Sequence, residues 1–119
     1  AAGNDLTRRD LQAEAKATRR PWDMAKGFDK SAVIGAIRPG PLPDGAIRCL
    51  VNGVARQEAL LSDMIWSPPA IIAALSRLVS LAPGDLIYTG TPAGVGPLIE
   101  GDTCRVEIEG LHPATVTIA

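Results

Sequence analysis

The sequence predicts a β-rich α+β fold with two short helices. An Asn-Gly dipeptide at 52–53 lies between two apolar-alternating runs, 47–51 and 54–58. It is the preferred two-residue turn of a β-hairpin, because both positions tolerate positive φ. Residues 103–109 and 114–118 form two further strand-like runs. Strands and helices do not alternate in the rhythm of a parallel doubly wound sheet, so nothing requires that class.

The first helix is expected over residues 8–18, a run rich in Ala, Glu, Lys and Gln. Thr7 is a good N-cap, and Asp10 three residues later completes a capping-box-like pattern. Pro21 ends the helix. Because the helix has few apolar residues, we expect a surface helix or a lid and not a core helix.

The middle of the chain alternates between loops and regular elements. Residues 31–37 are expected to be extended, and 38–45 to be a loop, because prolines and glycines cannot sustain a strand ladder. Ser67 precedes a second helix with proline in its first turn, and apolar residues at helical spacing predict that this helix packs one face on a sheet. A buried strand over 86–89 and a glycine-rich loop over 90–97 follow.

The composition is that of an ordinary globular domain, and we expect the protein to be located in the cytoplasm. Twelve basic and 13 acidic residues nearly balance, and the basic ones are scattered, so we expect no nucleic-acid partner. No apolar run approaches the ~20 residues that span a bilayer, so we expect no membrane partner. Cys49 and Cys104 lack metal-binding spacing, which favours buried free thiols over a disulfide or a zinc site.

Four residues near the amino end form a candidate anion site. Arg9 and Gln12 are three positions apart on the predicted helix and face the same way. Lys26 lies among apolar residues after a turn that can fold back toward Asp5, and desolvation makes its ammonium a stronger partner for an oxyanion. Carboxylate, guanidinium, amide and amine together suit an anionic, oxygen-rich ligand with a hard metal ion. A solvated helix face with a helix-flanking carboxylate is the alternative.

Three further features have weaker functional interpretations. The loop over 90–97 lacks the ending of a Walker loop, but its small residues let a ligand approach the backbone, with the Thr91 hydroxyl as a donor. Glu107 and Glu109 alternate on a strand and share a face, for which a solvated surface is favoured over a metal site. His112 has no nucleophile signature nearby, so we do not expect it to be a general base.

Five segments carry a family resemblance and follow one another in the family's order: GNDLTRRDLQ (3–12), PWDMAKGFD (21–29), VNG (51–53), MIW (64–66) and PGDLIYTGTPAGVGP (83–97). The last of them, followed by a Gly-Asp pair, is highly specific. On these segments the chain resembles the carboxyl-terminal catalytic part of the fumarylacetoacetate hydrolase family. The MIW segment and the Thr-Gly-Thr-Pro loop are most similar to the small acylpyruvate and fumarylpyruvate hydrolases.

The resemblance implies a mixed-sheet β-roll or sandwich, with residues 1–119 as the C-terminal part of a single catalytic domain whose N-terminal part is absent. It implies a homodimeric, Mg²⁺- or Mn²⁺-dependent enzyme of aromatic compound catabolism. Such an enzyme cleaves a carbon–carbon bond in a 2,4-dioxo acid such as fumarylpyruvate or acylpyruvate.

The resemblance also implies roles for single residues. Asp5 matches the family's metal-binding aspartate, and the accompanying Glu-x-Glu pair and the activating histidine and glutamate belong upstream of it. Arg9, Gln12 and Lys26 match the substrate-side arginine, glutamine and lysine. Thr91 matches the threonine of the Gly-Thr-Pro loop. Lys26 and Arg9 would be catalytic, because they would stabilise the charge that grows on oxygen.

Three alternatives remain open at this point. The same site could decarboxylate oxaloacetate or isomerise a related muconate. The chain could also be a catalytically inactive module for dimerisation or binding, because Asp5 is its only assigned metal ligand and Glu107 and Glu109 lie on the wrong side of the motif order. With nothing upstream, sheet edges would be left unpaired, so we expect these residues alone to aggregate or to need a partner chain.

Overall fold

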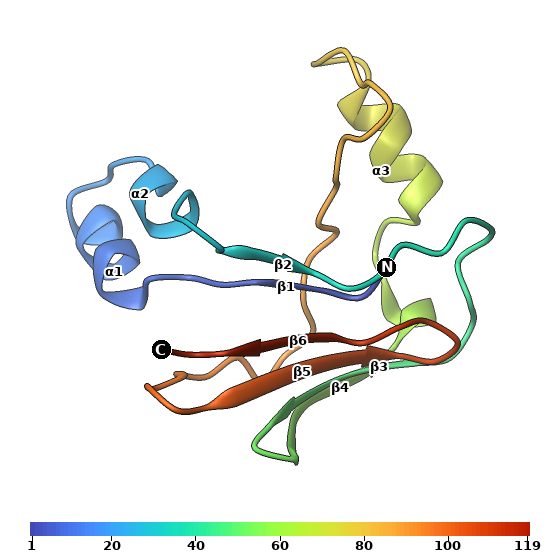
Figure 1. The fold of residues 1–119 in the computed structure, drawn as a ribbon. Coiled ribbons are helices and arrows are strands. Elements are labelled where there is room, and N and C mark those ends of the chain that lie inside the picture. Colours follow the sequence, from blue (N-terminus) through green and yellow to red (C-terminus); the bar gives the residue numbers. More distant parts are fainter.

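The structure is a computed structural model that describes residues 1–119, with two antiparallel sheets and three short α-helices (Figure 1). The strands of the four-stranded sheet lie in the order β4-β3-β5-β6: β4 Val54–Leu60, β3 Ala46–Val51, β5 Thr103–Ile108 and β6 Ala114–Thr117. The two-stranded sheet pairs β1 Gly3–Asp5 with β2 Ala32–Ile34. The β-rich α+β class is confirmed, but every pairing is antiparallel and the sheets are not mixed.

The β3–β4 hairpin has the predicted position and turn. Asn52 and Gly53 both adopt positive φ, 51° and 80°, as a type I′ turn requires. The turn is fixed to the start of β5, because the Thr103 amide donates to the Asn52 side-chain oxygen at 2.9 Å. The Asn52 amide group in turn donates to Asp102 Oδ1 at 2.7 Å. The hairpin and the β5–β6 pair therefore form one sheet through β3 and β5.

The two sheets form two layers around a thin core. The β1–β2 pair lies over one face of the larger sheet, beside β5 and β6 (Figure 1). Ala2, next to β1, is buried against Val106, Ile108 and Ala114. Alternate residues of β5 point into this layer, as the period-2 geometry of a strand dictates. The core is built from small and β-branched side chains, in agreement with the low aromatic content of the chain.

Both cysteines are free thiols, as expected, but only Cys104 is buried, and Cys49 is half-buried against the core. Their sulfur atoms lie 3.4 Å apart across the β3–β5 ladder, and the Asn4 side-chain amide donates to Cys104 Sγ at 3.1 Å. Burial and the neighbouring Cys104 raise the pKa of the Cys49 thiol to about 12. The Cys49 thiol therefore stays protonated at neutral pH, and the Asn4–Cys104 hydrogen bond joins the two layers.

Helix α1 (Arg9–Ala17) confirms the expected surface helix, since only Gln12 is buried in it. The predicted N-cap is wrong: Arg8 takes that position and its side chain makes no capping bond. The Thr7 hydroxyl accepts a hydrogen bond from Lys26 Nζ at 2.9 Å. The Thr7 hydroxyl oxygen, which the sequence predicted would cap α1, therefore takes part in a tertiary hydrogen bond instead.

A four-residue helix, α2 (Asp23–Lys26), was not predicted. It is too short to show a hydrophobic period. It lies against α1, because the Arg8 amide donates to the Ala25 carbonyl at 3.0 Å and the Arg8 guanidinium lies 4.5 Å from the centre of the Phe28 ring. This contact determines where the end of α2 lies relative to β1.

Helix α3 (Pro68–Leu75) begins after Ser67 as predicted, but it does not pack on a sheet as we expected. Ser67 caps it and accepts from the Ala70 amide at 3.4 Å. None of its residues is buried, and the helix projects away from both sheets (Figure 1). The expectation that it packs on a sheet is wrong, because apolar spacing indicates that a face seeks burial but not which surface covers it. A 3₁₀ turn, η1 (Leu61–Asp63), connects β4 to this region.

The predicted buried strand over 86–89 is absent. Leu86 and Thr89 are exposed, and the segment passes the β1–β2 pair without joining a ladder (Figure 1). The Tyr88 hydroxyl donates to the Val33 carbonyl at 3.0 Å. The Tyr88 side chain thus packs on the small sheet, although residues 86–89 do not form a strand. The glycine-rich loop over 90–97 is confirmed as irregular.

The folded chain leaves much surface uncovered. Its accessible surface is 8515 Å², against about 6,100 Å² for a compact monomer of 12.4 kDa. Only 8 of 119 residues are buried, and large apolar side chains such as Ile65 and Leu78 are 97% and 81% exposed. Both β4 and β6 are sheet edges. Such a surface is suited to contact with further protein. None of the helices has the length and apolar content that a bilayer crossing requires.

We expect residues 1–119, prepared alone, to self-associate, because exposed apolar side chains and unpaired strand edges bind one another. Size-exclusion chromatography with light scattering should show oligomers or aggregates. A monodisperse monomer that melts in one cooperative transition would contradict this expectation.

We expect Asp102→Asn to lower the unfolding temperature at pH 7. Hydrogen bonds from the Ile99 amide and the Asn52 side chain hold the pKa of the Asp102 carboxyl below its usual value. A lowered folded-state pKa stabilises the fold above the unfolded value of about 3.9, and this stability is lost as the pH falls through the folded-state pKa.

The difference between Asp102→Asn and wild type should therefore shrink as the pH is lowered from 7 toward 3, in thermal unfolding followed by circular dichroism. Asp44→Asn, an exposed carboxyl for which no hydrogen bond is found, is the matched control and should change little at any pH. An equal loss for both variants would count against the role of Asp102.

Candidate active site

The end of β1 and the end of α2 bring a carboxylate and an ammonium together. Lys26 Nζ lies 2.6 Å from Asp5 Oδ2 and donates to the Thr7 hydroxyl. The backbone positions both elements, because the Leu6 amide donates to the Ser31 carbonyl at 2.9 Å as the chain leaves β1. The two charged side chains are 35% and 48% exposed, and an ion pair of that kind adds only about 0–1 kcal/mol of stability. The pair therefore contributes little to the stability of the fold.

Arg9 and Gln12 form a second polar pair on α1. The Arg9 Nη1 group donates to Gln12 Oε1 at 3.0 Å, across the three-residue spacing that the sequence indicated. Gln12 is buried, whereas Arg9 is exposed. A buried amide thus orients an exposed guanidinium. No hydrogen bond or ion pair joins this pair to Asp5 or Lys26.

Thr91 lies on the glycine-rich loop, beside a residue that sequence analysis missed. Gln57 Nε2, on β4, lies 2.7 Å from Thr91 Oγ1 and 2.7 Å from the Pro92 carbonyl oxygen. Gln57 shares a half-buried face of β4 with Ala59. A polar residue on the inward face of a predicted strand was the signal that could have found it.

Tyr88 connects this loop to the carboxylate end of β1. Its hydroxyl binds Val33 of β2, and its ring packs so closely on β1 that a Cβ at Gly3 would lie 2.9 Å from Tyr88 Cε1. Burial and the negative charge of Asp5 raise the pKa of the Tyr88 hydroxyl. The loop that carries Thr91 therefore starts close to Asp5, although the two are far apart in sequence.

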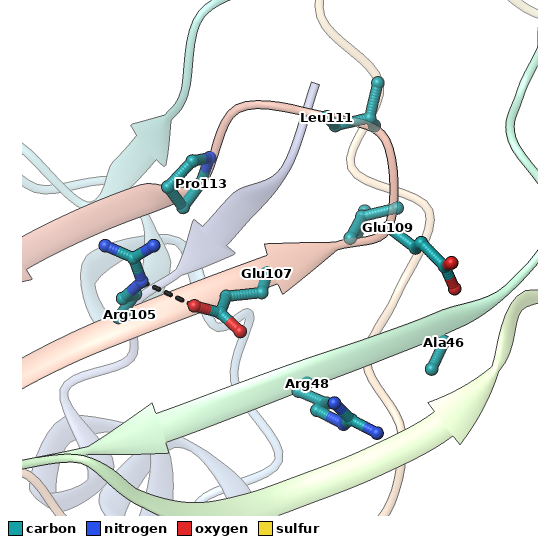
Figure 2. Close-up of a pocket in the computed structure, with 8 residues that line it drawn as sticks. Ala46, Arg48, Arg105, Glu107, Glu109, Leu111 and Pro113 are labelled. Carbon is teal, nitrogen blue, oxygen red and sulfur yellow. Dashed lines mark hydrogen bonds and ion pairs between the residues drawn. The ribbon is translucent and has the colours of Figure 1, made fainter.

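The glutamates of β5 belong to a different surface. Glu107 accepts from Arg105 at 2.6 Å on the face of the large sheet that points away from the core, and Arg48 projects from the neighbouring strand (Figure 2). Glu109 lies beyond the end of β5. His112 is exposed in the β5–β6 connection. The preference for a solvated glutamate face is confirmed, on an interior strand of the sheet and not on its edge.

The residues of this chain do not form a complete metal site. No group of three or more His, Cys, Asp or Glu side chains converges anywhere in the structure. A carboxylate such as Asp5 is the ligand type that Mg²⁺ and Mn²⁺ prefer, but a hard cation takes about six oxygen ligands. Asp5 therefore fits as one ligand of a site whose other protein ligands are not among these residues.

The fold is a two-layer antiparallel α+β domain, with a charged pair at the end of β1 and a glycine-rich loop held against β4. All of residues 1–119 match the family model described as "Fumarylacetoacetate (FAA) hydrolase C-terminal". The chain belongs to the fumarylacetoacetate hydrolase family.

Three relatives illustrate the range of the family. A fumarylpyruvate hydrolase of Ralstonia is 43% identical over 121 residues, which cover 99% of this chain and 63% of that protein. The mitochondrial oxaloacetate tautomerase FAHD1 of mouse is 45% identical over 111 residues, 90% of this chain and 50% of that one. The crystal structure of a Pseudomonas aeruginosa fumarylpyruvate hydrolase, in complex with Mn²⁺ and pyruvate, superposes with a TM-score of 0.92 at 40% identity and covers 98% of this chain and 52% of that one.

These coverages show that the chain spans between half and two thirds of the length of the relatives it matches. The fold class and the family are thereby confirmed. The assignments of Asp5, Arg9, Gln12, Lys26 and Thr91 stay predictions.

Proposed function

We propose that this chain is part of a Mg²⁺- or Mn²⁺-dependent hydrolase that cleaves a carbon–carbon bond in a 2,4-dioxo acid such as fumarylpyruvate or acylpyruvate. The observation that carries the proposal is the Asp5–Lys26 contact of 2.6 Å at the end of β1. It puts a metal-type carboxylate and a cation side by side, close to where the Thr91 loop begins. The identity to a Ralstonia fumarylpyruvate hydrolase supports the substrate class.

Asp5 would hold the metal together with ligands from outside these residues. A bound Mg²⁺ or Mn²⁺ supplies Lewis acidity at the 2-oxo carboxylate end of the substrate. The pyruvate bound by the Pseudomonas relative has this same end group.

The chain's own residues would bind the substrate and stabilise charge. Arg9, oriented by Gln12, presents a planar guanidinium suited to a carboxylate or an enolate oxygen. Lys26 offers an ammonium beside Asp5, where negative charge on a nearby oxygen would be stabilised. The Thr91 hydroxyl adds a neutral donor.

The proposed reaction needs charge stabilisation more than a nucleophile from this chain. A water molecule adds to the carbonyl distal to the 2-oxo acid end, and the carbon–carbon bond then breaks. Its electron pair goes to the enolate of pyruvate, which a proton converts to pyruvate, and the other product is a carboxylic acid. Cations near the enolate oxygen lower this barrier because the negative charge is greatest there.

A second candidate is keto–enol chemistry on oxaloacetate, by tautomerisation or decarboxylation, and the mouse relative named oxaloacetate tautomerase favours it. It uses the same enolate without an attacking water. Isomerisation of a muconate-type acid is a third. Comparing the turnover of acetylpyruvate, fumarylpyruvate, oxaloacetate and a muconate-type acid by one preparation separates the three.

A catalytically inactive binding module is the alternative from another class, since Asp5 is the chain's single assigned metal ligand. Calorimetric titration of residues 1–119 with Mg²⁺ should show no tight binding if the remaining ligands lie elsewhere. Under the proposed function, a polypeptide that adds the missing ligands to this chain would bind Mg²⁺, and absence of binding there would favour the inactive module. We also propose a homodimer, for which the uncovered apolar surface is the supporting observation.

We expect the Mg²⁺-loaded protein to consume acetylpyruvate and fumarylpyruvate, and EDTA to abolish the activity. Lys26→Met should lower kcat/KM by about 100-fold, because one charge-stabilising group is lost at the oxygen where charge develops. Loss of the diketone absorbance measures the rate.

Lys16→Met is the matched control for Lys26. Lys16 lies on the neighbouring helix α1, with its ammonium 4.8 Å from the Trp22 ring, and its replacement should leave the rate within about twofold. Full activity of Lys26→Met would contradict the charge-stabilising role assigned to Lys26.

A further inference from the structure

The glycine-rich loop is fixed onto β4 at two points. Gln57 Nε2 contacts both Thr91 and Pro92, at 2.7 Å each. Three residues after Thr91, Gly94 has a φ of +99°, and a Cβ there would overlap the carbonyl oxygen of Arg56. The loop backbone is thus pressed against β4 where Gln57 contacts it. By contrast, a Cβ at Gly96 would meet nothing within 4 Å.

The chemistry of these contacts determines the direction of each hydrogen bond. The Pro92 carbonyl can only accept, so the Gln57 atom facing it must be the NH₂ group and not the amide oxygen. An amide NH₂ nitrogen carries two protons and does not accept. The second proton therefore goes to the Thr91 oxygen, which is the acceptor in that bond. The Thr91 O–H proton is left free.

A free hydroxyl proton on an exposed loop residue is available to a ligand. Thr91 is exposed, and its only side-chain hydrogen bond in the structure is the one it accepts from Gln57. A hydroxyl whose oxygen already accepts one bond presents itself to an anion as a donor. Hydrogen bonds to an ionised acceptor are roughly twice as strong as neutral ones.

We propose that Gln57 is a positioning residue, which fixes the Thr91 hydroxyl as a hydrogen-bond donor toward the carboxylate of the bound 2-oxo acid. The inference rests on the proposed function, because it assumes that Thr91 contacts the ligand. It assigns to β4 a part in substrate binding that the charged cluster at β1 does not perform. Gln57 itself does not touch the substrate.

Two substitutions at Gln57 distinguish this role from simple packing. Gln57→Glu keeps the shape of the side chain but offers only acceptors, which would turn the Thr91 proton away from the ligand and repel the Pro92 carbonyl. Gln57→Met keeps the approximate length and removes both hydrogen bonds, which leaves the Thr91 hydroxyl free to rotate toward the ligand. If Gln57 only fills space, the isosteric Glu variant is the milder change. If it sets the donor direction, the Glu variant is the more severe.

The test measures KM and kcat for acetylpyruvate with the complete, Mg²⁺-loaded protein. Gln57→Glu should raise KM by about tenfold and Gln57→Met by less, with kcat within about twofold of wild type in both. Glu58→Gln, at the next position of β4 and paired with Arg48, is the control and should leave both constants unchanged.

A Thr91→Val background completes the experiment. Valine matches threonine in shape and has no hydroxyl, so Gln57→Glu should raise KM much less in that background, where only its repulsion of the Pro92 carbonyl remains. The inference is overturned if Gln57→Glu matches wild type, if Gln57→Met is the more severe change, or if the effects of Gln57→Glu and Thr91→Val simply add. If wild type neither turns over acetylpyruvate nor binds pyruvate in calorimetry, the proposed function fails instead.

Discussion

The packing of the short β1–β2 pair on the inner face of β5 and β6 is the constraint on which the rest of the structure depends. It works because the contacting residues are small: Ala2 is fully buried, and a Cβ at Gly35 would lie 2.8 Å from the Pro113 carbonyl oxygen. The close approach fixes the end of β1, and with it Asp5. Because Gly3 has no side chain, the Tyr88 ring can pack directly on β1. This contact positions the start of the loop that carries Thr91. Two separate parts of the candidate site thus depend on one layer contact.

Short sequence motifs correctly predicted those elements that are stabilised by contacts within a few residues. The Asn-Gly turn and the Ser67 cap are encoded within a few residues, and the structure has both. The N-cap at Thr7 was wrong because a residue 19 positions away, Lys26, takes its hydroxyl. The strand at 86–89 and the packing of α3 were wrong for a related reason. An apolar pattern indicates a face suited to burial, but whether a surface of the same chain covers it is decided by tertiary structure.

The residue types of the candidate site could be predicted, and the partners that orient them could not. Arg9 and Gln12 meet through helical spacing, which is visible in sequence. Gln57 and Tyr88 contact residues 34 and 55 positions away, and no local pattern reports such contacts. The family motifs supplied the rest, since they name Asp5, Lys26 and Thr91 by position. The structure places the charged candidate residues on β1, α1 and α2, and the neutral polar residues Gln57 and Thr91 on β4 and the loop.

The exposure of Asp5 and Lys26 bears on what activity requires. Both side chains are partly exposed, so water screens the two charges and weakens the attraction of Lys26 for a developing negative charge. Exclusion of water from the same groups would strengthen each of those interactions several-fold, which is how charge stabilisation becomes large in an active site. The chain exposes about 2,400 Å² more surface than a compact domain of its mass, much of it apolar. Under the proposed function, protein that covers this surface would also exclude water from Asp5 and Lys26, so the same contacts would bury apolar surface and strengthen charge stabilisation at the site.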